Sequence, residues 1–276
     1  MDIKHIGAMP FRNNPHLPDV IYKYRIWDDE RQKTILSERV VFMASPSSFE
    51  DNNDCRLQKR YDLMTEKEIN TKYLLVSKKI HHKWNLQQHH NFAKVWTKKS
   101  PLKNKIYIKQ LQERHFTEFN ESFGVLCLTA NPNNLDMWNK YSKKGSGFCV
   151  GFAPEILFEL TGGGGSVDYL DELPVIYHDD DYLVEHFKQI FSKEQKWSYE
   201  EEYRTFKTWP NPVSDYERKI KIPVKAYKEV IFGWLTPSYI KEEIKKVCIY
   251  QGLEIEMKFC ELLNDIIIIK PVANNA

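Results

Sequence analysis

The sequence predicts an α+β protein built around a mixed or antiparallel β-sheet. Short segments rich in β-branched and aromatic residues recur along most of the chain, which indicates many short strands. Helical patterns are instead concentrated in a few segments, and above all in one long insertion. The chain has 276 residues and is 42% hydrophobic, so it is long enough to bury a sizeable core.

Strands are expected where β-branched and aromatic residues cluster between turn-forming residues. Such side chains pack well on a pleated surface, while Pro, Gly, Asn and Ser favour turns. The glycine run at 162–165 precedes no Lys-Ser or Lys-Thr pair and is expected to be a plain loop. In chain order, the expected strands are 20–26, 40–44, 123–129, 147–152, 175–177, 197–204, 218–223, 230–234, 255–259 and 266–270.

Helices are expected where apolar residues recur at helical spacing. Residues 61–120 differ in composition from the rest of the chain. They contain one proline, no glycine and many Lys, Gln, His and Leu residues. This segment predicts an insertion of three helices that is broken near Ser100 and Pro101. We therefore expect a single α+β domain over 1–276 that contains a helical, lysine-rich insertion at 61–120. The other expected helices are 28–38, 135–141, 154–160, 181–196 and 237–250.

The net charge of +2 conceals a strong segregation of charge along the chain. Residues 67–116 contain eleven lysines and one arginine against two glutamates, and twelve minus two gives +10. Residues 165–202 contain eleven acids against three lysines, which gives −8. Two interpretations remain open: the two segments neutralise each other, or the basic segment forms a surface for phosphates or nucleic acid.

Cysteine usage and hydropathy bear on the compartment. The five cysteines are scattered, odd in number and free of C-x-x-C spacing, which favours reduced thiols in a reducing compartment. No run of 18 apolar residues is present, and the first residues lack the apolar core of a signal peptide. We expect a cytoplasmic protein with no membrane partner, and its oligomeric state is left open.

The segment 197–204 is the strongest functional signal. If it forms a strand, alternation places Glu200, Glu202 and Arg204 on one face, with the two carboxylates about 7 Å apart. Such carboxylates repel each other unless a cation, a metal or the hydroxyls of a substrate hold them. The alternative is an exposed edge strand in which an Arg204–Glu202 pair contributes under about 1 kcal/mol.

The sequence lacks several common catalytic motifs. The sequence has no G-x-S-x-G elbow, no P-loop lysine motif and no dinucleotide-binding G-x-G-x-x-G before a helix. On a helix, His82 and His89 would lie about 10.5 Å apart along the axis, which is too far for one ion. No metal cofactor is expected.

Several short motifs follow one another along the chain. They are Tyr22-Lys23-Tyr24-Arg25, residues 45–51, Phe123-Gly-Val-Leu-Cys-Leu, Met137-Trp138-x-x-Tyr141, Gly147-x-Cys-Val-Gly-Phe, Lys196-Trp197-x-Tyr199-Glu200-x-Glu202-x-Arg204 and Val230-Ile-Phe-Gly. Together they resemble the motifs of the bacterial family known as domain of unknown function 2971. The likeness runs from about residue 20 to the C-terminus, and the Trp-x-x-Glu-x-Glu-x-Arg piece is its most specific part. The usual Asn-Asp-Pro after the second strand is replaced here by Glu50-Asp51-Asn52.

A second resemblance suggests an activity. An arginine on an early strand, Ser-x-Ser after the next strand and Glu-x-Glu late in the chain resemble the Arg–Ser–Glu pattern of ADP-ribosyltransferases. That resemblance implies a small mixed α/β fold that binds NAD in a cleft of its sheet. It implies that Arg25 holds the NAD phosphates and that Ser45 or Ser47 supports the nicotinamide ribose or positions the glutamate. Glu202 would stabilise the oxocarbenium-like transition state, and Glu200 would orient the acceptor.

The resemblance also indicates which aromatic residues touch NAD and what the protein does. Tyr24, Trp138 or Tyr199 would stack on nicotinamide or adenine. The expected function is an NAD-dependent ADP-ribosyltransferase or an NAD-cleaving effector of the toxin or phage-defence type, with a nucleic-acid or protein acceptor.

Two alternatives remain. One is a nuclease whose acidic residues bind Mg²⁺ while the basic insertion grips nucleic acid. Its metal ligands would be Asp51, Asp54, Glu200 and Glu202. The other is a non-catalytic interaction module in which Glu-x-Glu-x-Arg is a buried structural network.

Overall fold

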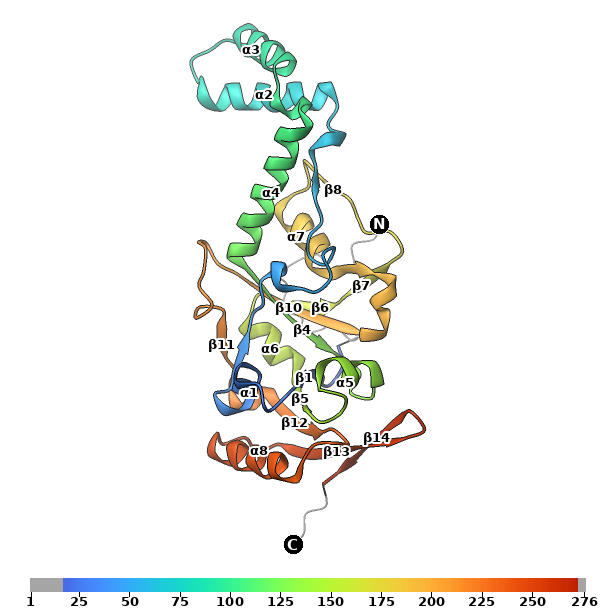
Figure 1. Cartoon of the computed structure of the whole chain (residues 1–276). Helices are drawn as coiled ribbons and strands as arrows, with labels where there is room; N and C mark the ends of the chain where they lie inside the picture. The colour runs from blue at the N-terminus through green and yellow to red at the C-terminus, as the bar shows by residue number, and fades with distance from the viewer. Residues whose placement is uncertain (1–16, 273–276) are drawn as a thin grey trace.

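The computed structural model describes residues 17–272 and is built around one eight-stranded mixed sheet (Figure 1). Its strand order is β14-β13-β12-β5-β1-β4-β10-β6. Every neighbouring pair in this sheet is antiparallel except β12 and β13, which run parallel. The predicted α+β class with a mixed sheet is therefore confirmed. The strands are β1 (Ile21–Arg25), β4 (Phe123–Thr129), β5 (Phe148–Phe152), β6 (Gly164–Ser166), β10 (Glu202–Thr208), β12 (Tyr227–Phe232), β13 (Glu256–Leu263) and β14 (Ile266–Pro271).

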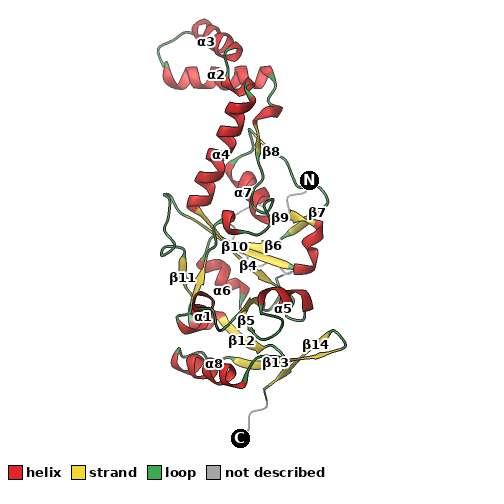
Figure 2. Ribbon diagram, in the orientation of Figure 1, coloured by secondary structure: helices red, strands yellow, loops and turns green. Residues whose placement is uncertain are grey.

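Three short two-stranded ladders surround this sheet (Figure 2). One of them, the parallel pair β7 and β9, carries residues of the candidate site described below. The ladders are formed by β2 (Val40–Phe42) with β11 (Lys219–Lys221), β3 (Lys59–Arg60) with β8 (Ile176–Tyr177), and β7 (Asp168–Leu170) with β9 (Ser192–Glu194).

Both faces of the central sheet are covered by helices. α1 (Glu30–Ser37), α6 (Pro154–Leu160) and α8 (Ser238–Tyr250) pack their apolar side chains on one face of β5 and β12 in the largest core cluster. α5 (Leu135–Tyr141) packs Met137 and Trp138 on the other face, against the two tyrosines of β1. Successive side chains of β1 therefore point toward two different cores, as the alternation of its sequence predicts.

The segment 61–120 contains three long helices that extend away from the sheet. Figure 1 shows α4 (Lys105–Ser122) running outward from β4, with α2 (Glu66–Ile80) and α3 (Leu86–Lys98) at its far end. Thr65 and Asn85 each begin their helix with a capping box. Pro101, where the sequence predicts a break, begins the short 3₁₀ turn between α3 and α4. We call α2, α3 and the loop between them the helical arm.

The sheet splits between β1 and β4. These strands pair at a single position, Tyr22 opposite Thr129. Farther along β4, Val125 forms an isolated bridge with Ala44, so β4 no longer pairs with β1 there. Cys127 lies between these two contacts, and its carbonyl oxygen accepts a 2.6 Å hydrogen bond from Lys23. The split opens the space in which the candidate site lies.

Three expectations about secondary structure are wrong. The helix expected over 181–196 ends at Phe191, because Ser192–Glu194 forms β9 and pairs with β7. Residues 197–204 do not form one strand: Gln195–Glu200 is a 3₁₀ helix (η5), and Glu201 is left-handed with φ 43° before β10 begins. The side-chain amide of Asn131 donates to the carboxylate of Glu201, and that of Asn134 donates to the carbonyl oxygen of Tyr199. These two hydrogen bonds hold the turn without a strand partner.

The glycine run at 162–165 is also not a plain loop. β6 begins at Gly164 and pairs with β10. A Cβ atom at Gly164 would lie 2.6 Å from the carbonyl oxygen of Arg204, so only glycine permits this approach.

α7 (Tyr182–Phe191) is the remaining helix, and it ends directly before β9. All five cysteines are free. Within residues 17–272, none of the helices combines the length and the apolar character needed to cross a bilayer.

Candidate functional site

A pocket of about 370 Å³ lies in the split of the sheet. Its wall is formed by β1, the end of β2 with the loop after it, β4, α5, and the segment from β9 through η5 to the start of β10, so five separate parts of the chain meet there. The volume falls within the range of about 300–1,000 Å³ that is common for small-molecule sites. The polar residues of the wall fall into an acidic group and a basic group.

The acidic group surrounds one lysine. Lys193 on β9 places its Nζ atom 2.5 Å from Glu200 and 2.8 Å from Glu202, with Asp54 at 3.6 Å. All four side chains are buried. Like-charged carboxylates can gather here because a cation lies among them.

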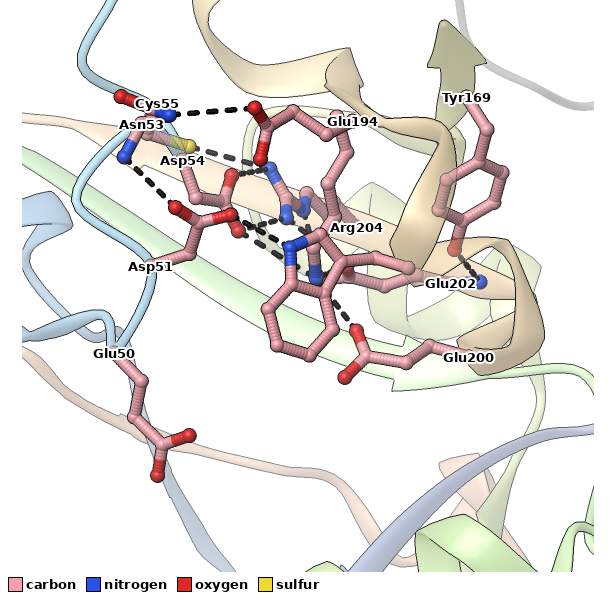
Figure 3. A network of polar contacts seen from close by, with 12 residues as sticks. Glu50, Asp51, Asn53, Asp54, Cys55, Tyr169, Glu194, Glu200, Glu202 and Arg204 are labelled. Carbon is pink, nitrogen blue, oxygen red and sulfur yellow. Dashed lines mark hydrogen bonds and ion pairs between the residues drawn. The ribbon is translucent and has the colours of Figure 1, made fainter. Parts of the chain in front are cut away.

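Arg204 completes this network, as Figure 3 shows. Its guanidinium is fully buried and binds two carboxylates in the bidentate manner: Glu202 at 2.8 and 2.9 Å, and Asp54 at 2.8 and 2.7 Å. Burial by itself raises the pKa of Glu202, but the charges of Arg204 and Lys193 outweigh burial and hold that pKa well below its usual range. Glu202 is therefore a fixed negative charge at neutral pH.

The basic group consists of Lys23 and Arg25, which alternate along β1. Lys23 donates to the carbonyl of Cys127, and Arg25 donates to its own neighbour, the carbonyl of Tyr24, at 3.1 Å. Among residues 17–272, no carboxylate lies within ion-pair distance of either side chain. Burial, and then the nearby charge of Arg25, lowers the pKa of Lys23 to about 8, and burial lowers the pKa of Arg25 to about 10.

Lys23 and Arg25 are half-buried, have no carboxylate partner among residues 17–272, and are destabilised by their surroundings. Each lowered pKa means that the surroundings disfavour the charged form of the side chain. An anion bound beside Lys23 and Arg25 would reverse this effect. A planar guanidinium next to an ammonium is well suited to phosphate oxygens.

The rim of the pocket combines aromatic rings with a third lysine. Lys140 lies 3.6 Å from Glu200 and 4.5 Å from the ring centroid of Trp197. Trp197 donates its indole N–H to Asp51 at 2.6 Å, and Tyr141 donates its hydroxyl to Glu200 at 3.0 Å. The carboxylate of Glu200 is thus held from both sides, and flat ring surfaces lie next to it.

The structure brings together four of the predicted site residues. Arg25, Tyr24, Glu200 and Glu202 all line the same pocket. The strand that was expected to align the two glutamates does not exist, but η5 and β10 still direct both to Lys193.

The other four predicted residues do not line the pocket. Ser45 and Ser47 face each other at 3.3 Å outside it, whereas Ser48 is part of its wall. Trp138 is completely buried beneath Tyr24, with ring centroids 5.0 Å apart, so it has no free face for a ligand. Tyr199 also lies outside the lining.

Lys23 and Lys193 were not among the predicted site residues. A signal for Lys23 was present, because the alternation of the first strand places it on the same face as Arg25. No comparable signal marks Lys193, since its position among the carboxylates depends on the path of the chain from β9 through η5 to β10.

The acidic group can be compared with a metal site. Lys193 occupies the position among the three carboxylates where a divalent ion would bind, and Arg204 takes oxygens of two of them. Among residues 17–272, no group of three or more His, Cys, Asp or Glu side chains is arranged to hold a metal ion.

Comparisons with known proteins give no further guide to the family. No family model matches the chain, and no curated protein or solved structure matches it at a significant level. The two resemblances above therefore rest on the motifs alone.

Proposed function

We propose that the protein binds NAD in the pocket between β1 and β4 and cleaves the bond between nicotinamide and ribose. The observation that carries this proposal is the division of one pocket into a set of carboxylates and two cations that have no carboxylate partner among residues 17–272. NAD needs both, because its pyrophosphate is anionic and its ribose becomes cationic as nicotinamide leaves. The ADP-ribosyl group then passes to water or to an acceptor.

The basic group accounts for binding. Arg25 and Lys23 would hold the pyrophosphate oxygens through charge-assisted hydrogen bonds. Trp197 lines the same pocket, and its ring supplies flat apolar surface for the nicotinamide or adenine base. The ring of Tyr24 is 2% exposed and packs edge-on against Trp138, so it offers no free face to the base.

The acidic group accounts for catalysis. Loss of nicotinamide leaves positive charge on the ribose, as in glycoside hydrolysis. Glu202 stays ionised and is held rigidly by Arg204, so it can stabilise that charge without reorganising. It is unsuited to proton transfer because its pKa lies far below neutral pH. Glu200, on the outer side of Lys193, would orient the incoming nucleophile.

The biological role follows from the same chemistry. An enzyme that consumes NAD or modifies cell components with ADP-ribose depletes or disables the cell in which it acts. We therefore infer a cytoplasmic effector of the toxin or phage-defence type.

The direct test is nicotinamide release from NAD by the purified chain. Glu202→Gln removes the charge and hardly changes the volume, and we expect turnover to fall by about 10²–10³-fold. Glu201→Gln is the matched control, because Glu201 belongs to the same motif but is exposed and bonded to Asn131. It should keep wild-type turnover, and circular dichroism should show that both variants fold.

Other outcomes would count against the proposal. Equal turnover in wild-type protein and Glu202→Gln would remove Glu202 from the reaction. No nicotinamide release by wild-type protein, with loss of folding in Glu202→Gln, would support a purely structural network. Mg²⁺-dependent cutting of nucleic acid without NAD cleavage would support the nuclease interpretation.

A further inference from the structure

We propose that the helical arm binds single-stranded nucleic acid, with its lysines on phosphates and two tryptophans stacked on bases. This inference does not depend on NAD cleavage, because it concerns a surface remote from the pocket in sequence and in fold. Four features of the arm support it: its charge, the lack of ion pairs, the distribution of its lysines and its exposed rings.

The arm is strongly basic. Residues 66–99 contain eight lysines against two glutamates, and eight minus two gives +6. All eight side chains are exposed. A local charge of this size attracts polyanions, and phosphate contacts dominate the affinity of proteins for nucleic acids. The lysines are Lys67, Lys72, Lys78, Lys79, Lys83, Lys94, Lys98 and Lys99.

The fold does not neutralise this charge. Among residues 17–272, no ion pair joins a lysine of the arm to the acidic segment 165–202. The acids of that segment instead pair elsewhere, for example Glu185 with Lys59 and Asp180 with Lys188. Of the two interpretations of the segregated charge, mutual neutralisation is therefore not observed.

The lysines of α2 form two rows and do not share one face. At about 100° per residue, Lys67 and Lys78 lie within about 20° of each other, and Lys72 and Lys79 lie about 100–140° farther around the helix axis. A helix that lies on a membrane surface would separate its lysines from a continuous apolar face. Charge on two sides of the helix fits a flexible phosphate chain that passes across the arm.

Exposed aromatic rings lie between the lysines. Trp84 is 36% exposed and stacks on His81 with centroids 3.8 Å apart and planes 7° apart. Trp96 is 44% exposed and stacks on Tyr73 at 6.1 Å. Rings supported from behind in this way offer flat platforms, and stacking on such rings is how proteins bind unpaired bases without reading their sequence.

The position of the arm leaves it accessible. Figure 1 shows α2 and α3 at the end of the molecule opposite α8, joined to the sheet through α4. Lysines near α8 therefore provide a control of equal charge at the opposite end. Lys225, Lys228 and Lys246 are exposed and, among residues 17–272, form no ion pair.

The test is fluorescence anisotropy of the full chain with a labelled 20-nucleotide single strand and with its duplex. We compare the arm variant Lys78→Glu/Lys79→Glu/Lys83→Glu with the control Lys225→Glu/Lys228→Glu/Lys246→Glu. Both change the net charge by six units. We expect the arm variant to lose at least tenfold in affinity and to lower the salt slope by up to about 2, and the control to stay within twofold. Trp96→Ala should weaken single-strand binding at least fivefold and duplex binding less.

Three results would overturn the proposal. The first is no binding by wild-type protein at 50 mM salt. The second is an equal loss in the arm and control variants, which would mean that net charge alone drives the association. The third is binding to vesicles of anionic phosphatidylserine without binding to the single strand, which would make the arm a membrane-surface element.

Discussion

Lys193 and Glu202 form a 2.8 Å ion pair that joins the middle of β9 to the start of β10 across the short helix η5. Both side chains are buried, and Glu200 of η5 binds the same ammonium group. The lysine thus explains how two carboxylates can be so close. It also links the turn at Glu201 to the sheet, so the geometry of the acidic group depends on this cation together with Arg204.

Replacing Lys193 by Met should therefore destabilise the fold strongly. The substitution leaves two buried glutamates next to Asp54 without their shared partner, and breaking a buried ion pair by removing one partner costs about 3–5 kcal/mol. Urea unfolding followed by circular dichroism measures this loss. Lys246→Met, at an exposed position on α8, is the control and should change the free energy of unfolding little. A loss in Lys193→Met as small as in the control would show that the carboxylates do not need the lysine.

Stability should also fall in acid because of Glu202. Its pKa is held well below the usual range in the folded protein, whereas the unfolded chain has the ordinary value of about 4.3. The contribution of Glu202 is therefore complete above about pH 5 and is lost as the pH falls through the acid range. Urea midpoints at pH 3, 4, 5 and 7 should show this decline. The difference between wild-type protein and Glu202→Gln should shrink toward pH 3, and a constant difference would contradict the assignment.

Most of the fold was predictable because the sheet follows local patterns. β1 alternates two tyrosines with two cations, and β4 and β5 are almost entirely apolar, as buried strands are. The errors occur where distant contacts override local preference. Gly164 joins the sheet because its missing side chain lets β6 approach Arg204, a contact that no local pattern predicts.

The site was predictable only in part, for a related reason. Arg25 and the two glutamates stand out as charged residues within apolar surroundings. Ser45 and Ser47 were chosen by order along the chain, but the turn that follows β2 directs Ser48 toward the pocket. Lys193 was missed because its role depends on the turn at Glu201 and not on residue spacing.

Lys23 should show opposite effects on stability and on binding. Its ammonium is half-buried and has no carboxylate partner in the described part of the chain, residues 17–272. Its folded pKa of about 8 lies below the unfolded value of about 10.4. The unfolded chain therefore binds the extra proton between these values, so the penalty is complete below pH 8 and is relieved as the pH rises to about 10.5. Lys23→Met should raise the free energy of unfolding at pH 7 by on the order of 1–2 kcal/mol and weaken NAD binding.

Urea unfolding and NAD titration of the same variant measure the two effects. The gain in stability should decrease at pH 10, where wild-type Lys23 is largely neutral in the fold. A Lys23→Met variant that is less stable than wild-type protein at pH 7 would show that the ammonium group is well satisfied, and the case for an anion beside it would fail.

The KM for NAD should rise above pH 8 for the same reason. If Lys23 binds a phosphate, only its protonated form does so, and in the free protein that form is lost around pH 8. Between pH 7 and pH 9 the KM should therefore increase about tenfold while kcat changes less. Lys23→Arg keeps its charge throughout this range and should give a flat profile. Arg25→Ala should raise the KM at every pH and move the rise to higher pH, because the charge of Arg25 helps to lower the pKa of Lys23. A rise of equal size in Lys23→Arg would assign the titration to another group and remove Lys23 from the phosphate site.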